Sequence, residues 1–67
     1  MVKNRLKEIR MKEYLMNMSE FSDFLGLTLS MYSQLENGKK GCSLKVAIEI
    51  SNKLNKNVND IWYLDLL

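Results

Sequence analysis

The fold is decided between Leu25 and Lys39, where the chain reads Leu-Gly-Leu-Thr-Leu-Ser-Met-Tyr-Ser-Gln-Leu-Glu-Asn-Gly-Lys. Gly26 can adopt the left-handed backbone that ends a helix and begins a sharp turn. Thr28, two residues later, is a preferred N-cap residue, and Asn37-Gly38 closes the stretch. The stretch therefore predicts a tight turn followed by a short helix over about residues 28–36.

Another helix is expected just before this turn. Asn17 can cap it, and Glu20, three residues later, completes a capping box. The apolar face of this helix is expected to consist of Phe21, Phe24 and Leu25. Two short helices meeting at such a turn form a helix-turn-helix unit, expected here over about residues 18–37, and its second helix can enter a DNA major groove.

The rest of the chain also has helical periodicity. It contains no proline, and no segment alternates between apolar and polar residues as a strand would. Further helices are expected over about residues 3–14, 43–54 and 57–62, the second of them with Leu44, Ala47, Ile50 and Leu54 on its inner face. The predicted fold is all-α, a compact five-helix arrangement in a single domain over residues 1–67.

Few residues are suited to catalysis or metal binding. The chain has no histidine, one cysteine (Cys42) and no glycine-rich phosphate loop. We therefore expect no enzyme activity and no metal, cofactor or small-molecule ligand. The charged start of the chain and the lack of a long apolar run predict a cytoplasmic protein that does not contact membranes.

Charge is unevenly distributed along the chain. Residues 1–17 and 39–57 carry net charges of +3 and +4, whereas residues 18–38 carry −3 and residues 58–67 carry −2. Because DNA phosphates attract cations, phosphate contacts are expected from the segments that flank the helix-turn-helix unit.

The second helix of the unit has side chains that can read bases. Gln34 can make two hydrogen bonds to adenine, and Ser30 can donate to or accept from any base. Leu29 and Met31 can contact thymine methyl groups, or they can pack against the turn. All of these residues can also form an ordinary solvated helix face, so the sequence leaves both interpretations open.

Together these segments resemble the Cro and lambda-repressor-like helix-turn-helix family, also called the XRE type. The resemblance extends from Arg5-Leu6-Lys7-Glu8-Ile9-Arg10 to Asn59-Asp60-Ile61-Trp62, and its most specific part is Ser33-Gln34-Leu35-Glu36-Asn37-Gly38-Lys39. It implies a five-helix domain that binds double-stranded DNA and regulates transcription, usually as a homodimer, in phages, mobile elements or bacteria.

The resemblance also implies roles for individual residues. The base-facing positions are Thr28, Leu29, Ser30, Met31, Ser33 and Gln34. The phosphate-facing positions are Ser19, Asn37, Lys39, Lys40 and Lys45. Arg10 and Glu36 occupy the positions of a structural ion pair between the first and third helices. Lys39 and Lys40 also follow a helix end, where lysines complement the helix dipole.

The chain departs from the family pattern at three places. Met18 stands where the family often has a glutamine that contacts phosphate and braces the third helix. The turn before the second helix is one residue longer than expected and lacks glycine. Cys42 stands where a proline often precedes the cap of the fourth helix.

The C-terminal segment is unusually apolar for the end of so small a domain. Its large side chains include Trp62, Leu64, Leu66 and Leu67. They can fold back on the first helix, or they can form an apolar patch that a second copy of the chain covers, which is the arrangement we favour. A two-fold dimer would place two reading helices one duplex turn apart, about 34 Å, and would match a palindromic operator.

Two classes of function fit these features. The first is a sequence-specific transcriptional regulator, a dimeric repressor that reads the major groove with residues 28–36. The alternative is a protein-interaction module with the same fold and weak DNA binding, such as an antirepressor or antitoxin. The acidic helix-turn-helix unit and Met18 favour that alternative.

Overall fold

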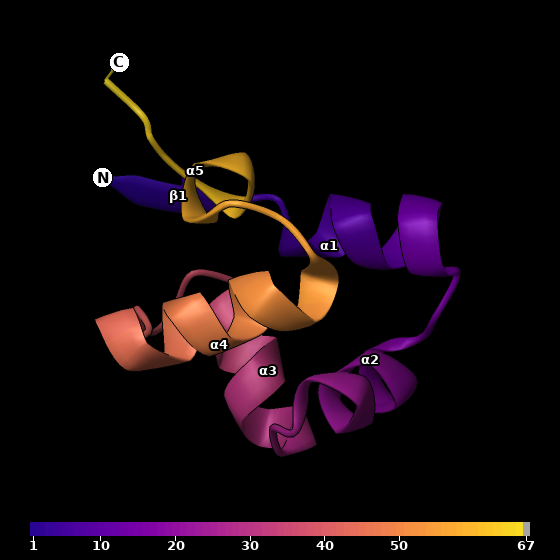
Figure 1. Cartoon of the computed structure of the whole chain (residues 1–67). Coiled ribbons are helices and arrows are strands. Elements are labelled where there is room, and N and C mark those ends of the chain that lie inside the picture. Colours follow the sequence, from indigo (N-terminus) through magenta and orange to yellow (C-terminus); the bar gives the residue numbers. More distant parts are fainter. Residues whose placement is uncertain (67) are drawn as a thin grey trace.

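The structure is a computed structural model that describes residues 1–66 and contains five α-helices and a small sheet (Figure 1). The elements follow in the order β1 (Val2–Asn4), α1 (Leu6–Ile9), η1 (Arg10–Tyr14), α2 (Met18–Leu25), α3 (Leu29–Glu36), α4 (Leu44–Leu54), α5 (Val58–Ile61) and β2 (Trp62–Leu64). None of the helices in this part of the chain has the length and hydropathy needed to cross a membrane.

The helix-turn-helix boundaries lie where the capping residues predict them. At the start of α2, the Asn17 side chain accepts from the Glu20 N–H at 2.8 Å, and the Glu20 carboxylate accepts from the Asn17 N–H at 2.9 Å. Gly26 ends α2 in the left-handed conformation at φ 75°. At the start of α3, Thr28 Oγ1 accepts from the Met31 N–H at 3.1 Å. These local bonds satisfy backbone groups that a helix end would leave open.

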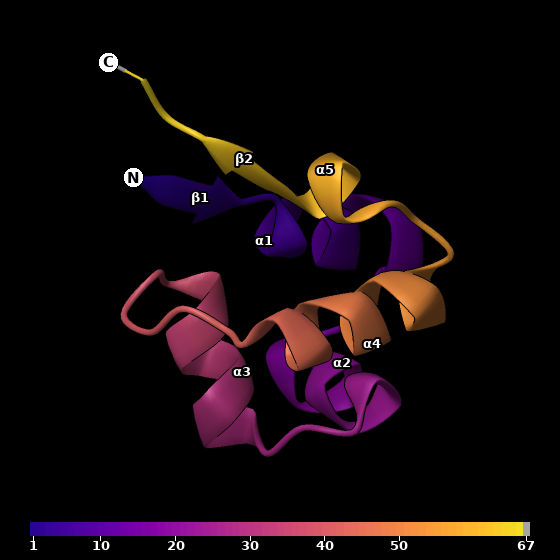
Figure 2. The ribbon, with the colours of Figure 1, turned by 60° about the vertical axis from the view of Figure 1, so that its left-hand side comes forward.

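The core lies between the helix-turn-helix and the two ends of the chain. In Figure 2, α1, α5 and the sheet lie above α4, α2 lies below it, and α3 stands beside its N-terminal end. The buried apolar side chains are Leu6, Ile9, Phe21, Leu25, Tyr32, Leu35, Ala47, Ile50, Leu54 and Ile61. Of the predicted inner face of α4, Ala47, Ile50 and Leu54 are therefore confirmed. Burial of each large apolar side chain contributes about 1.5–3 kcal/mol to folding.

The first helix is shorter than predicted and ends in a π-helical turn. Its α-helical part begins at Leu6 rather than at Lys3, and the chain continues as η1. In this turn the Leu15 N–H donates to the Arg10 carbonyl, so the turn holds one residue more than an α-helical turn. Leu15 then adopts a left-handed conformation at φ 53° without being glycine. The additional residue before α2 is thus accommodated without moving Arg10 away from α3.

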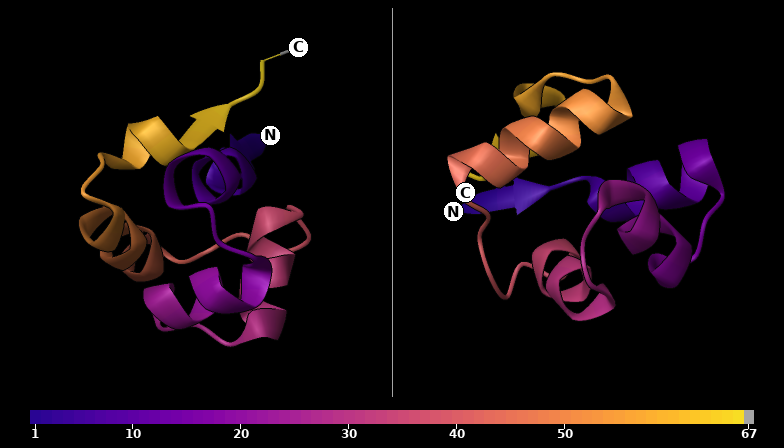
Figure 3. Two further views of the ribbon diagram at one scale, coloured as in Figure 1. Left: turned by 90° about the vertical axis from the view of Figure 1, so that its right-hand side faces the viewer. Right: turned by 60° about the horizontal axis from the view of Figure 1, so that its bottom comes forward.

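The two ends of the chain pair as strands, so the all-α prediction was wrong in this respect. β1 and β2 form an antiparallel two-stranded sheet in which Val2 lies opposite Leu64 and Asn4 lies opposite Trp62. Figure 3 shows both chain ends on the side of the molecule opposite the turn between α2 and α3. The prediction failed because strands of three residues are too short to show alternation, and their pairing joins opposite ends of the sequence.

Two predicted inward positions and one predicted helix end also need correction. Phe24 is 41% exposed and Leu44 is 72% exposed. Phe24 packs at the surface, where its ring centroid lies 5.3 Å from that of Tyr14. Trp62 was expected in the fifth helix, but α5 ends at Ile61 and Trp62 begins β2. Helical spacing alone does not reveal that the first turn of α4 has few neighbours to pack against.

Candidate nucleic-acid interface

Helix α3 has one face in the core and one face in solvent. Tyr32 and Leu35 point inward and are 0% and 7% exposed. On the outer side, Leu29 is 50% exposed and Met31 is 48% exposed, with Ser30 exposed between them. Because the inner contacts fix the helix, its outer face is held rigidly toward solvent.

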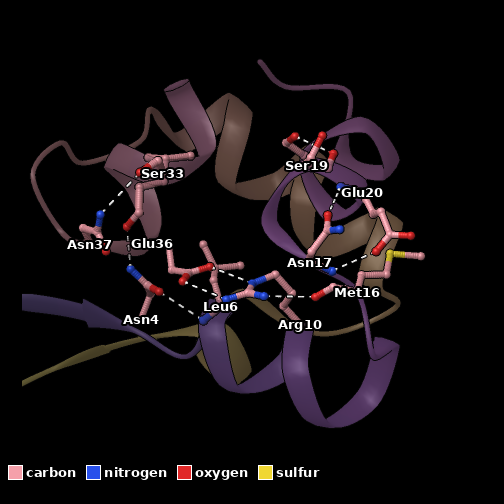
Figure 4. Close-up of polar contacts among 12 residues, drawn as sticks. Asn4, Leu6, Arg10, Met16, Asn17, Ser19, Glu20, Ser33, Glu36 and Asn37 are labelled. Atoms are coloured by element: carbon pink, nitrogen blue, oxygen red, sulfur yellow. Dashed lines mark hydrogen bonds and ion pairs between the residues drawn. The ribbon is translucent and has the colours of Figure 1, made fainter. Parts of the chain in front are cut away.

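The other proposed base-facing residues are less free. Thr28 uses its hydroxyl oxygen to cap α3. Ser33 is half-buried, and its hydroxyl oxygen accepts from the Asn37 side-chain amide at 3.4 Å (Figure 4). Gln34 is half-buried and, together with Met31, lines a hollow of about 180 Å³ between α3 and the start of α4. The base-facing positions therefore differ in how freely their side chains can reach DNA.

The loop after α3 holds lysines beside this outer face. Backbone N–H groups of Lys39 and Lys40 donate to the Gln34 carbonyl at 2.9 and 3.3 Å, which closes the helix end. Lys39, Lys40 and Lys45 are exposed, and none of the three forms an ion pair within residues 1–66. Their ammonium groups are therefore free to contact phosphates.

The N-terminus of α2 is a weaker phosphate position. Ser19 is exposed there, and its carbonyl accepts from the Ser22 hydroxyl at 2.8 Å. The Glu20 carboxylate already occupies the helix end through the capping box (Figure 4). Met18, where the family often has glutamine, is partly buried and packs against the core. Met18 therefore braces α2 by apolar contact instead of by hydrogen bonding.

Arg10 and Glu36 form a two-pronged ion pair between η1 and α3 (Figure 4). Nε lies 3.1 Å from Oε2 and Nη2 lies 3.2 Å from Oε1. Nη1 also donates to the Met16 carbonyl at 3.0 Å. The two side chains are only 10% and 5% exposed. The hydrogen bonds to Glu36 raise the pKa of the Arg10 guanidinium even though burial opposes this.

The Tyr32 hydroxyl is buried close to this ion pair. Its oxygen has no hydrogen-bond partner among residues 1–66. Burial raises the pKa of Tyr32, and the neighbouring Glu36 carboxylate raises it further. The phenol therefore stays neutral and acts as part of the packed inner face of α3.

Asn4 links the sheet to α3 and was missed by sequence reasoning. Its Nδ2 donates to the Leu35 carbonyl near the end of α3 at 2.9 Å, and its Oδ1 accepts from the Leu6 N–H at 3.0 Å (Figure 4). The available signal was an asparagine two residues before the first apolar helix position, where its side chain can bond the backbone N–H two residues on in an Asx turn. The contact to α3 spans most of the fold and leaves no local pattern.

The C-terminal apolar residues do not behave as one group. Trp62 is half-buried against the core, whereas Leu64 is 66% exposed and Leu66 is 87% exposed. Leu67 lies outside the described residues. Trp62 and Leu64 line a shallow apolar hollow of about 400 Å³ with Val2 and Val58. A neighbouring hollow of about 360 Å³ extends this surface past Trp62 to Leu44 and Cys42.

Comparison with known protein families identifies the family to which the chain belongs. A family model described as Helix-turn-helix matches residues 6–61, which include α1 through α5. No curated protein matches the chain significantly. The match covers most of the sequence and includes both the buried Arg10–Glu36 pair and the whole of α2 and α3. The chain therefore belongs to the XRE-type, Cro/lambda-repressor-like helix-turn-helix family of DNA-binding transcription regulators.

Proposed function

We propose that this regulator is a repressor that binds a palindromic operator as a homodimer and reads it with the outer face of α3. The observation that carries the proposal is that this face is exposed and is flanked by Lys39, Lys40 and Lys45, which form no ion pair within residues 1–66. A short helix of this kind fits the width of the major groove. Repression requires nothing beyond occupancy of the operator.

The base contacts are proposed to centre on four side chains. Leu29, Ser30 and Met31 are the exposed ones, and Gln34 lies beside Met31 on the same face, since they are three residues apart in the helix. Gln34 can pair with adenine, and Ser30 can bond to any base. Thr28 and Ser33 would contribute less, because their hydroxyl oxygens already accept bonds within the protein.

The phosphate contacts are proposed to come from Lys39, Lys40 and Lys45, with Asn37 and Ser19 as secondary contacts. We expect Lys39→Ala with Lys40→Ala to weaken binding on all DNA sequences. The slope of log affinity against log salt should flatten by roughly one unit for each lost phosphate contact. The matched control is Lys7→Ala, which removes an exposed lysine of α1 outside the loop after α3. An unchanged slope in the double variant would remove these lysines from the interface.

The homodimer is proposed to form through the apolar surface around the sheet. Trp62, Leu64, Leu66 and Leu67 were expected there, and the exposed Leu64 and the half-buried Trp62 lie on its hollow. Val2 and Leu44 extend the same surface and are 61% and 72% exposed. Apolar surface of this kind on a small domain indicates an interface between proteins. A two-fold axis through this surface would relate the α3 helices of the two copies.

Light scattering at tens of micromolar protein, without DNA, tests the dimer. The wild-type chain should be a dimer, and Leu64→Lys should be a monomer because it places a charge on the proposed interface. Leu15→Lys is the matched control, since Leu15 is 83% exposed and lies at the end of η1. A monomeric wild-type protein, or a Leu64→Lys variant that stays dimeric, would contradict this interface.

Selection of bound sequences from random duplex DNA tests the proposed function as a whole. The proposal expects one consensus made of two inverted half-sites whose centres are about one duplex turn apart. A non-palindromic consensus would contradict the homodimer. The absence of any consensus would favour the protein-interaction module, which the acidic Glu20 and Asp23 on α2 and the lack of cations on α3 support.

A further inference from the structure

We propose that α3 discriminates DNA sequences in part through the methyl groups of thymine, which Leu29 and Met31 contact in the major groove. The inference rests on the proposed DNA-reading function of α3 and adds the chemical class of base pair that it selects. It assigns Leu29 and Met31 as specificity-determining residues and predicts half-sites in which A·T pairs lie under the helix.

The first observation is that both side chains leave about half of their surface exposed and lie outside the packed core. Leu29 is 50% exposed and Met31 is 48% exposed, and neither belongs to the core or to the partly buried residues packed against it. About half of the surface of each side chain therefore remains uncovered by the turn and the core. Leu27 packs against the core just before α3, together with the buried Tyr32. The two exposed side chains are available to an apolar partner.

The second observation is that α3 offers bases no charged group. Its only charged residue is Glu36, whose carboxylate is held by Arg10 and is 5% exposed. Recognition of guanine by arginine or lysine, the commonest specific contact, is therefore impossible from this helix. Recognition of cytosine by a free carboxylate is excluded for the same reason. Discrimination must come from neutral side chains.

The third observation is the chemistry of the groove itself. Among the four base-pair arrangements, the thymine C5-methyl is the one apolar group that unmodified DNA presents in the major groove. Leu29 and Met31 match it in polarity. The neighbouring polar readers are Ser30 and Gln34, and glutamine prefers adenine. Gln34 and Met31 line the same hollow, so one can contact an adenine while the other contacts an adjacent thymine methyl.

The arrangement of charge directs these apolar groups toward DNA rather than toward a protein. Lys39, Lys40 and Lys45 are exposed and unpaired in the described part of the chain, and Lys40 and Met31 line one hollow. Cations placed there suit a phosphate backbone on the rim of the groove. Leu29 and Met31 would then be desolvated in the centre of the contact, where each methyl contact has its largest effect.

The test uses a duplex chosen by the wild-type protein from a random thymine-containing pool. The same duplex is then synthesised with uracil in place of thymine, which removes only the C5-methyl groups. We expect the affinity of the wild-type protein to fall about fourfold for each contacted methyl. In Leu29→Ala and Met31→Ala, the ratio of the affinities for the thymine and uracil duplexes should shrink by that factor.

Leu15→Ala is the matched control, because Leu15 is an exposed leucine at the end of η1, outside both α3 and the proposed dimer surface. It should keep the full preference for thymine. Thermal unfolding of each variant checks that it is folded, and exposed positions should change little. A wild-type protein that binds a defined consensus equally well with thymine or uracil would overturn this inference and leave the proposed function standing. A selection that yields no consensus would overturn both.

Discussion

The helix-turn-helix and the paired chain ends are held in different ways. In α2 and α3 the backbone is fixed by caps between residues three positions apart, at Asn17 and Thr28. In the sheet, Val2 pairs with Leu64 at the other end of the sequence. The reading unit is therefore shaped locally, whereas the support behind it requires the rest of the chain to be folded.

The shape of α3 and its position in the fold therefore have separate origins. α3 can form from its own caps, but its orientation depends on two long-range contacts. The Arg10 guanidinium holds Glu36 at the end of the helix, and the Asn4 amide holds the Leu35 carbonyl. Loss of either contact should leave the helices recognisable and weaken their attachment to the remainder of the fold.

The largest effect is expected from Arg10→Ala. The substitution leaves the Glu36 carboxylate nearly buried and without its cation, which should lower the free energy of unfolding by about 3 kcal/mol. Urea unfolding followed by circular dichroism measures this change. The control is Lys12→Ala, which removes an exposed i,i+4 pair with Glu8 and should change stability by less than about 0.5 kcal/mol.

A double replacement tests whether the unpaired charge on Glu36 causes this loss of stability. Arg10→Met with Glu36→Leu removes both charges and keeps apolar volume, so much of the stability should return. If Arg10→Ala unfolds at the same urea concentration as the wild-type protein, the pair does not anchor α3. If the double variant is as unstable as Arg10→Ala, the lost contact to the Met16 carbonyl matters more than the charge on Glu36.

A smaller effect is expected from Asn4→Ala. The change removes the bonds to the Leu35 carbonyl and the Leu6 N–H and should lower stability by about 1–2 kcal/mol. Amide hydrogen exchange should increase in β1 and at the end of α3 more than in α2. Asn52→Ala on the exposed side of α4 is the control. Equal exchange at both ends of α3 would show that the sheet does not position the helix.

The smallest effect, and the one of opposite sign, is expected from Leu15→Gly. Leu15 is 83% exposed and has φ 53°, a conformation that costs a non-glycine residue about 1–2 kcal/mol. Glycine removes this strain and loses little packing, so the melting temperature should rise by a few degrees. Leu15→Ala keeps the strain and should not raise it. A lower melting temperature for the glycine variant would mean that the exposed leucine has a role in packing.

The same division between local and distant contacts explains what the sequence could predict. Asn17, Gly26, Thr28 and Ser43 act on neighbours, and the helices that they begin or end lie where expected. The pairing of Val2 with Leu64 has no local signal, and it was missed. The sequence shows which residue types α3 contributes to the proposed interface. It does not show their unequal exposure, which depends on how α3 packs against α4 and the core.

Gln34→Ala probes base reading by the outer face of α3 in a single variant. Affinities of the wild-type and variant proteins are measured on the duplex selected from random DNA and on unselected DNA. We expect a loss of about 1–3 kcal/mol of binding free energy on the selected duplex and little change on unselected DNA. The preference at one or two base pairs in each half-site should also be relaxed. Equal losses on both kinds of DNA would contradict base reading by Gln34.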